Sequence, residues 1–205
     1  MKKLILVFLL LALPIVQAYQ PVIVRDSPTE IKEPVYSKVY FGALGGEAEI
    51  YKIETNESFR MHLSIMSPYP DGKTNFNVSI LKNNTVIVQP ETKWRKYEDG
   101  FANDNYFRGF EYTKVFEPGV YEIKITNPEK RGRYALSVGK REKYSPKSVF
   151  HSIITMPRVK NEFLGKPAYT GYNNYLGIVI IGLFILFAFL VYLVFLFPKM
   201  YVGYR

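Results

Sequence analysis

The sequence of 205 residues contains no cysteine and only two histidines. The absence of cysteine excludes disulfides, cysteine metal ligands and a thiol nucleophile. His62 falls on the polar face of a predicted strand and His151 lies far along the chain, so we expect no site that uses both. Motifs for a nucleophile elbow, a zinc protease or a phosphate-binding loop are also missing. We predict no enzyme and no cofactor, because a hydrolase with an unfamiliar site needs a base that the sequence hardly supplies.

Acidic residues offer one candidate for a metal site. Glu98, Asp99 and Asp104 supply the hard oxygen ligands that calcium prefers. Their spacing matches no EF-hand loop, and solvated loop acids are the simpler interpretation. We therefore predict no metal site.

Strong clustering of charge is also missing. The formal net charge of the chain is +9, and the lysines and arginines are spread along the sequence. Nucleic-acid binding is not expected from such a distribution. A modest basic excess instead favours contact with anionic lipid head groups or acidic surface polymers.

One long run, residues 175–197, lacks charge altogether and reads YLGIVIIGLFILFAFLVYLVFLF. At the helical rise such a run spans the roughly 30 Å hydrocarbon core of a bilayer. A buried core helix is the weaker alternative, because so small a chain has too little protein to cover every face of this helix. We predict a single transmembrane helix over residues 175–197.

The first 18 residues follow the pattern of a secretory signal peptide. Lys2 and Lys3 precede an apolar stretch, and Val16-Gln17-Ala18 ends it with a cleavage site. An uncleaved anchor is the alternative, but the apolar stretch is short for a span. Together with the span at 175–197, this pattern predicts an extracellular N-terminal domain and a cytoplasmic tail at residues 198–205.

Between these termini the chain reads as a leader followed by strands. Residues 19–37 contain three prolines and are predicted to be an extended leader rather than a folded unit. Residues 38–141 carry the two-residue hydrophobic period of half-buried strands, with turn signals between them. We predict an all-β fold, an antiparallel sandwich of about eight strands. The inward-facing positions are Phe59, Met61, Leu63, Ile65, Phe76, Val78, Ile80, Tyr121, Ile123, Ile125, Tyr134, Leu136 and Val138.

Three segments within this region carry a family resemblance: GEAEIYKIETNESFRMHLSI, NFNVSILKNNTVIV and FEPGVYEIKITNPEKRGRYALSV. Their order resembles the bacterial and archaeal pre-peptidase C-terminal domain, a small jelly-roll-like β-sandwich. The family pattern G-x-Y-x-[IV]-x-[IV], followed by Y-x-L-x-[IV], matches Gly119, Tyr121, Ile123, Ile125, Tyr134, Leu136 and Val138. The resemblance covers residues 38–140 and implies an accessory or binding role. Such domains usually accompany a secreted hydrolase, which this chain lacks, so no catalytic residue is carried over.

The longest stretch without a strand pattern, residues 89–105, holds the only tryptophan. We identify Trp94, Arg95, Lys96 and Tyr97 as a candidate surface for a ligand or partner protein, since aromatic and basic side chains stack on sugars and form interface hot spots. The alternative is a structural role in which Trp94 closes one end of the sandwich.

Residues 142–174 connect the predicted sandwich to the predicted span. Ser145 and Pro146 are typical of a helix start, and Val149, Phe150, Ile153 and Ile154 recur at helical spacing. We predict an amphipathic segment that lies on the membrane surface or, alternatively, packs against the sandwich. Residues 165–174, GKPAYTGYNN, are predicted to be a flexible spacer.

Three sequons place candidate N-glycosylation sites at Asn56, Asn77 and Asn83. Two of them fall at predicted turns, and Asn77 falls on a polar strand face. Chance occurrence of the pattern is the alternative in a chain rich in asparagine. The bias toward Lys, Ile and Tyr suggests a prokaryotic or archaeal source.

These observations lead to two hypotheses of function. The first is a membrane-anchored, non-catalytic accessory or docking subunit at the cell surface, with membrane lipid and a membrane or surface-layer protein as partners. The alternative is a carbohydrate-binding or adhesion module that binds a polysaccharide through the Trp94 region.

Overall fold

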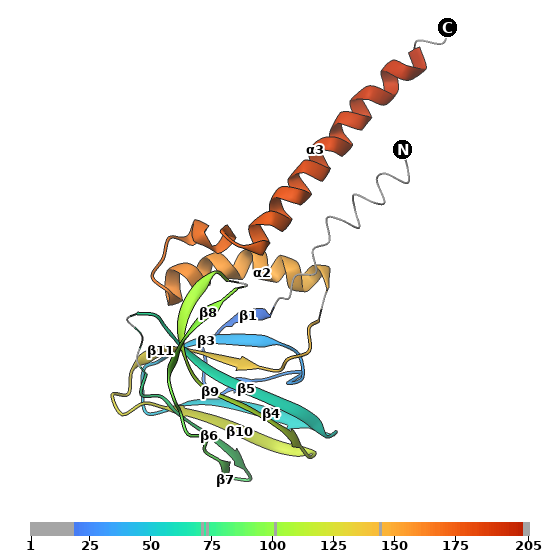
Figure 1. Ribbon diagram of the computed structural model, residues 1–205. Coiled ribbons are helices and arrows are strands. Elements are labelled where there is room, and N and C mark those ends of the chain that lie inside the picture. Colours follow the sequence, from blue (N-terminus) through green and yellow to red (C-terminus); the bar gives the residue numbers. More distant parts are fainter. Residues whose placement is uncertain (1–18, 71, 73, 101, 144, 203–205) are drawn as a thin grey trace.

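The computed structural model describes residues 19–202 except residues 71, 73, 101 and 144. The signal peptide predicted for residues 1–18 lies outside the described residues. The described chain is a β-sandwich of two sheets, followed by a group of helices and by one long apolar helix that extends away from the sandwich (Figure 1). This architecture confirms the predicted fold class.

The first sheet has six strands in the order β1-β3-β11-β5-β9-β8. The second sheet has five strands in the order β2-β4-β10-β6-β7. Most neighbours are antiparallel, as predicted, but β1 is parallel to β3 and β2 is parallel to β4. The bounds are β1 Gln20–Ile23, β2 Thr29–Glu30, β3 Lys38–Leu44, β4 Glu49–Thr55, β5 Phe59–Pro68, β6 Asn77–Lys82, β7 Thr85–Val88, β8 Arg95–Asp99, β9 Asp104–Phe116, β10 Gly119–Thr126 and β11 Gly132–Val138.

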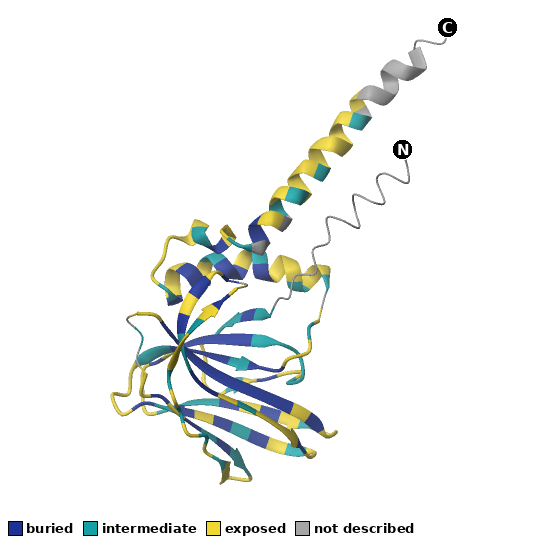
Figure 2. Cartoon of the chain, viewed as in Figure 1, coloured by how far each residue is buried: buried dark blue, intermediate teal, exposed yellow. Residues whose placement is uncertain are grey.

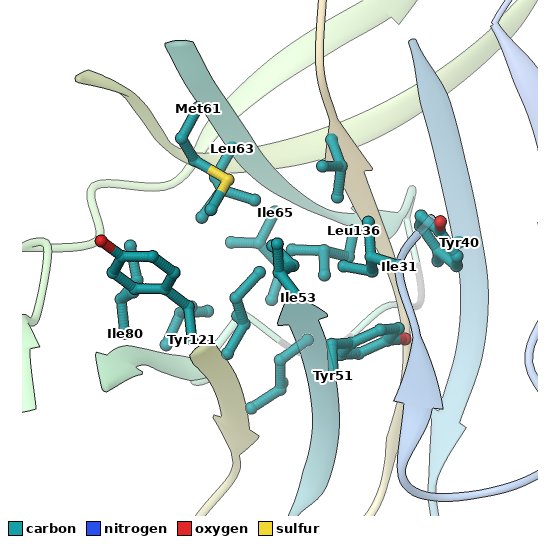
Figure 3. Close-up of a cluster of buried hydrophobic side chains, with 14 of the residues drawn as sticks. Ile31, Tyr40, Tyr51, Ile53, Met61, Leu63, Ile65, Ile80, Tyr121 and Leu136 are labelled. Carbon is teal, nitrogen blue, oxygen red and sulfur yellow. The ribbon is translucent and has the colours of Figure 1, made fainter. Parts of the chain in front are cut away.

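The space between the sheets is filled by the side chains that the two-residue period places inward. All thirteen of the predicted inward positions belong to the main buried cluster. Figure 3 shows aliphatic side chains of this cluster meeting the rings of Tyr40, Tyr51 and Tyr121. The buried hydroxyl groups of Tyr51 and Tyr134 hydrogen-bond to each other at 2.8 Å, which avoids the desolvation penalty of an unpaired polar group. The predicted apolar core is confirmed.

Residues 19–37 are not the separate leader that the prolines suggested. They supply β1 and β2, which are edge strands of the two sheets. Val22 and Val24 pack against the core, and Ile31 is buried within it. Proline is compatible with an edge strand, because its missing N–H need not remove a hydrogen bond of the sheet. The β-branched residues between the prolines are therefore the better indicator of the structure of this segment.

A tight turn at Asn83 and Asn84 joins β6 and β7. Both asparagines adopt positive φ, at 51° and 62°. This is the conformation of a type I′ hairpin turn, which asparagine tolerates better than most residues.

Four helical elements follow the sandwich: α2 Pro146–Arg158, the π-helix η1 Val159–Phe163, the 3₁₀-helix η2 Ala168–Tyr172 and α3 Tyr175–Val202. We call residues 142–174 the helical connector. Ser145 caps α2 by accepting a hydrogen bond from the Ser148 amide, so the predicted helix start is confirmed. Within α3, Leu176–Leu193 is long and apolar enough to cross a membrane.

Candidate functional site

The predicted binding residues 94–97 are mostly in a strand rather than a loop. β8 pairs antiparallel with β9, which places Lys96 opposite Phe107 and Tyr97 opposite Tyr106. Because alternate residues of a strand point to opposite faces, Trp94 and Lys96 are separated from Arg95 and Tyr97. The structure therefore divides the four residues between two faces of the sheet.

Trp94 lies against the core of the sandwich. Its ring is 6.4 Å from the Phe76 ring, and it packs against the main buried cluster. A Cβ atom at Gly109 would lie 3.2 Å from the Trp94 ring, so glycine leaves the room that the indole occupies. These contacts are the ones expected if Trp94 has a structural role in the sandwich rather than a role in binding.

The other three candidates have different surroundings. Tyr97 packs over the outer face of the six-stranded sheet, and its ring is 3.3 Å from the Arg108 guanidinium carbon. The Lys96 ammonium lies 4.7 Å from the centre of the Tyr69 ring. Arg95 is exposed. Lys96 and Tyr69 thus form a pair of exposed side chains, one basic and one aromatic.

The three candidate glycosylation sites are all exposed. Asn56 and Asn83 lie in the turns after β4 and β6, and Asn77 is the first residue of β6. Both β4 and β6 belong to the five-stranded sheet, which lies on the side of the sandwich away from α2 (Figure 1).

Asp99 and Asp104 are not the solvated loop acids that the sequence suggested, because Asp99 ends β8, Asp104 begins β9 and both are buried. Asp104 is 0% exposed and accepts contacts from the Lys160 ammonium at 2.5 Å and the Lys166 ammonium at 2.6 Å. Lys160 is only 2% exposed and also donates to the Ala102 carbonyl at 2.7 Å. We call Asp99, Asp104, Lys160 and the partly exposed Lys166 the buried charge cluster. Over the described residues, no group of three or more histidine, cysteine or acidic side chains is arranged to hold a metal ion.

Asp99 belongs to the same cluster through strand pairing. It is directly opposite Asp104 on the β8–β9 hairpin, a position where two like charges repel. Its carboxylate accepts a hydrogen bond from the Tyr19 hydroxyl at 2.8 Å. Burial and the neighbouring Asp99 carboxylate hold the pKa of Tyr19 well above its usual value. Tyr19, the first described residue, is therefore neutral and is attached to the hairpin by this hydrogen bond.

The buried charge cluster joins the sandwich to the helical connector. Asp99 and Asp104 come from the hairpin, whereas Lys160 is in η1 and Lys166 follows it. Removing charges from water costs several kcal/mol per ion, and paired charges of opposite sign offset that cost. Each side of the contact thus depends on the other for neutralisation.

Apolar contacts reinforce the same junction. The Phe41 and Phe163 rings meet edge to face with centroids 5.0 Å apart, and Val159 packs beside them on the outer face of the six-stranded sheet. A second cluster joins Ala102 of the hairpin tip, Met156 of α2 and Leu176 in the first turn of α3. The first turn of α3 is therefore packed against α2 and against the tip of the β8–β9 hairpin.

Residues 165–174, predicted to be a flexible spacer, contain η2 instead. A Cβ atom at Gly171 would lie 2.9 Å from the Pro157 nitrogen, so η2 approaches α2 at a distance that only glycine permits. The Tyr172 hydroxyl donates to the Ile153 carbonyl at 3.1 Å, and Asn174 caps α3 by accepting from the Leu176 amide at 2.9 Å. Small and polar residues, which suggested flexibility, here allow close packing and helix capping.

The helix α2 has both of the faces that its sequence predicted. Ser152, Thr155 and Met156 are buried, so one face packs against its neighbours, as in the second alternative. The other face leaves Phe150 64% exposed and Ile154 46% exposed. Figure 2 shows exposed residues along the outer side of α2 and along most of the described length of α3.

The two histidines have separate partners. His62 is buried, its Nδ1 atom lies 2.8 Å from the Thr113 hydroxyl, and its Nε2 atom lies 3.8 Å from a Glu111 carboxylate oxygen. Burial lowers the pKa of His62 to about 4, with the Lys140 charge acting in the same direction. His151 instead contacts the Pro21 carbonyl through Nε2 at 3.0 Å. The polar strand face predicted for His62 is therefore covered.

Comparison with known proteins gives structural neighbours only. No protein-family model matches the chain, and neither does any curated protein. The fold is similar to the pre-peptidase C-terminal domain of a collagenase from Bacillus anthracis, with 18% identity, a TM-score of 0.37 and coverage of 56% of this chain and 98% of that domain. It is also similar to Xyl-CBM35 in complex with a disaccharide containing glucuronic acid, with 13% identity, a TM-score of 0.32 and coverage of 62% of this chain and 91% of that one. The first neighbour belongs to the family that the sequence motifs resemble.

Proposed function

We propose that this protein is a membrane-anchored β-sandwich that acts, without catalysis, as an accessory or docking subunit of an assembly in the membrane or the surface layer. The sandwich lies outside the cell, α3 spans the membrane once and residues 198–205 form the cytoplasmic tail. The packed connection between the sandwich and α3 is the observation that carries this proposal.

Anchoring is supported by the surface of α3. Its described side chains are apolar on all sides, and those of Phe184 and Phe195 are 72% and 71% exposed. Exposed apolar area costs about 25 cal/mol per Å² in water, whereas the hydrocarbon core of a bilayer removes that cost. A helix of this composition is stable where lipid surrounds it.

A docking role is supported by the way the sandwich is attached. The hairpin tip, α2 and the first turn of α3 share one buried cluster, and the buried charge cluster adds ion pairs beside it. Such an attachment presents the same side of the sandwich to a lateral partner in every copy. A preorganised surface loses less conformational entropy on binding than one on a flexible tether.

The partner can be identified by extracting the full-length protein from its native membrane in mild detergent and analysing the bound proteins by mass spectrometry. We expect one membrane or surface-layer protein at constant stoichiometry. The D104N variant should recover less of this partner, because it loosens the attachment. The control E98Q changes an exposed residue of the same hairpin and should recover as much partner as the unmodified protein. Recovery of the protein alone would refute the docking role, and recovery without detergent would refute the anchor.

Carbohydrate binding is the second candidate function, and the exposed Tyr69 ring beside Lys96 is the observation that favours it. Tyr69 is 38% exposed and its ring lies 5.0 Å from that of Phe107, so an aromatic surface is available for a sugar ring. Binding of surface polysaccharides to the full-length protein, lost in Y69A but kept in K93A, would support this function. Absence of polysaccharide binding by the unmodified protein would remove it.

Glycosylation of the outer domain is proposed at Asn56, Asn77 and Asn83, whose exposure leaves their amides accessible. Mass spectrometry of peptides from the native protein tests each site. Unmodified peptides at all three asparagines would refute the proposal.

A further inference from the structure

An open pocket of about 210 Å³ lies between the edge strand β1 and the helix α2. One wall comes from β1 and the residues after it, and the other comes from α2. The pocket is lined by Val22, Ile23, Arg25, His151, Thr155 and Arg158. Three of these residues carry basic side chains, and none carries an acid.

The charges of the pocket have no acidic partner in the described part of the chain. Neither Arg25 nor Arg158 forms an ion pair with a carboxylate of the described residues. The ion pairs that the described residues do form mostly use exposed lysines. The guanidinium group offers several N–H donors in a planar fork, which matches the oxygens of a phosphate. Two arginines without an ion pair among the described residues thus bring to one pocket the positive charge and the N–H donors that an anion requires.

The α2 wall is arranged for such a ligand. His151, Thr155 and Arg158 are spaced at i, i+4 and i+7, so they share one helix face. The His151 ring is held by the Pro21 carbonyl at 3.0 Å, and the Thr155 hydroxyl lies 3.4 Å from the same ring nitrogen. A hydroxyl donor thus stands between the two basic side chains of this face.

One wall of the pocket is α2, the helix that also packs against the base of the proposed membrane span. Arg158 is in the last turn of α2, two residues after Met156, which packs against Leu176 at the base of α3. On the same helix, the exposed side chains of Phe150 and Ile154 are next to the basic face, one and three residues from His151. Apolar side chains flanked by basic ones are typical of helices that lie at the interface of a bilayer with anionic lipids.

We propose that this pocket binds the phosphate of an anionic lipid head group, with Arg25 and Arg158 as its charged ligands and Val22 and Ile23 against the adjoining glycerol carbons. Phe150 and Ile154 enter the outer leaflet beside it. The proposal rests on the membrane anchoring proposed above. It assigns to the connector a second role, the choice of lipid around the protein.

The test uses the full-length protein in mild detergent with mixed phosphatidylglycerol and phosphatidylcholine, released into a native mass spectrometer. We expect phosphatidylglycerol to be retained in preference to phosphatidylcholine. Each of R25Q and R158Q should lower its retention roughly fivefold, because a basic residue near a membrane contributes about 1 kcal/mol to anionic lipid binding. The controls R60Q and R95Q remove the same charge from exposed positions on β5 and β8 and should leave retention unchanged.

Two results would overturn the proposal. Equal retention in R25Q, R158Q and the controls would show that lipid binds through net charge alone. Binding of inorganic phosphate that depends on Arg25 and Arg158, without any preference between the two lipids, would show that the pocket takes free phosphate instead. Both results differ from failure of the anchor, in which the protein would stay in solution without detergent and retain neither lipid.

Discussion

The space between the two sheets and the junction between the sandwich and the helical connector are both buried, but they are built differently. The first is almost wholly apolar and uses residues that alternate along neighbouring strands. The second combines small apolar clusters with a buried pair of carboxylates and a pair of lysines. The apolar core tolerates changes that keep volume, whereas the junction depends on particular partners.

This difference separates two tasks of the chain. The core makes the sandwich stable, and the junction fixes its position relative to α3. A buried ion pair contributes little net stability compared with apolar residues, but loss of one partner leaves the other charge buried and unpaired. The junction is thus suited to specify one arrangement rather than to stabilise the fold.

The largest expected effect comes from breaking the buried charge cluster. D104N leaves the Lys160 ammonium buried without its carboxylate, and we expect the connector to lose about 3–5 kcal/mol of stability against local opening. Hydrogen exchange of the α2 and η1 amides in the full-length protein measures this loss. The double variant D104N/K160M should restore much of the protection, since it buries no unpaired ammonium. Unchanged exchange in D104N would contradict a specifying role for the cluster.

The core should respond more uniformly. Ile123 is 0% exposed in the middle of β10, and I123A removes buried methylene groups and leaves a cavity. We expect the free energy of unfolding of the sandwich to fall by about 2–4 kcal/mol, measured by chemical denaturation in detergent. V120A, on the exposed face of the same strand, should change it by less than about 0.5 kcal/mol. Equal effects of the two variants would break the contrast between faces.

A smaller loss is expected at Trp94, which is only partly buried. W94A removes its contacts with Phe76 and exposes part of the core, and we expect a loss of roughly 2 kcal/mol in the free energy of unfolding. The exposed neighbour Lys93 serves as the control, with K93A leaving stability unchanged. A stable W94A variant would indicate that the indole serves a ligand rather than the core.

A further prediction concerns pH and the outer face of the six-stranded sheet. Burial keeps His62 neutral, with a pKa of about 4 against 6.5 in a solvated histidine. Below pH 6.5 the unfolded chain binds a proton that the folded chain rejects, so stability should fall as the pH is lowered from about 6.5 to about 4. Denaturation curves across this range should show a shallower fall for H62Q. Identical slopes would exclude His62 as the source.

The core strands could be predicted because their pattern is local. Alternation over 59–65, 76–80, 121–125 and 134–138 assigns each side chain to a face without knowledge of its partners. β3 and β5 are buried on both faces over part of their length, since the connector covers the outer face. That cover explains why Met66 and Phe41 are apolar on a face expected to be polar.

The junction could not be predicted from local signals. Asp104 and Lys160 are 56 residues apart, and each is an ordinary charged residue in its own segment. Strand β8 was missed because RKYED has little apolar alternation and is held mainly by pairing with β9. The same holds for β1, whose prolines suggested a leader, and for η2, whose glycine and asparagine suggested a spacer.

The role proposed for the junction requires that the sandwich and α3 form one rigid unit. Since the chain has no cysteine, spin labels can be attached specifically to cysteines introduced at two exposed positions. These substitutions are Lys114→Cys on β9 and Ile178→Cys on α3. Pulsed electron paramagnetic resonance of the full-length protein in lipid nanodiscs then measures the distribution of distances between them. We expect one narrow distribution, which should become broad when D104N is added. A broad distribution in the doubly labelled protein without D104N would contradict the role proposed for the junction.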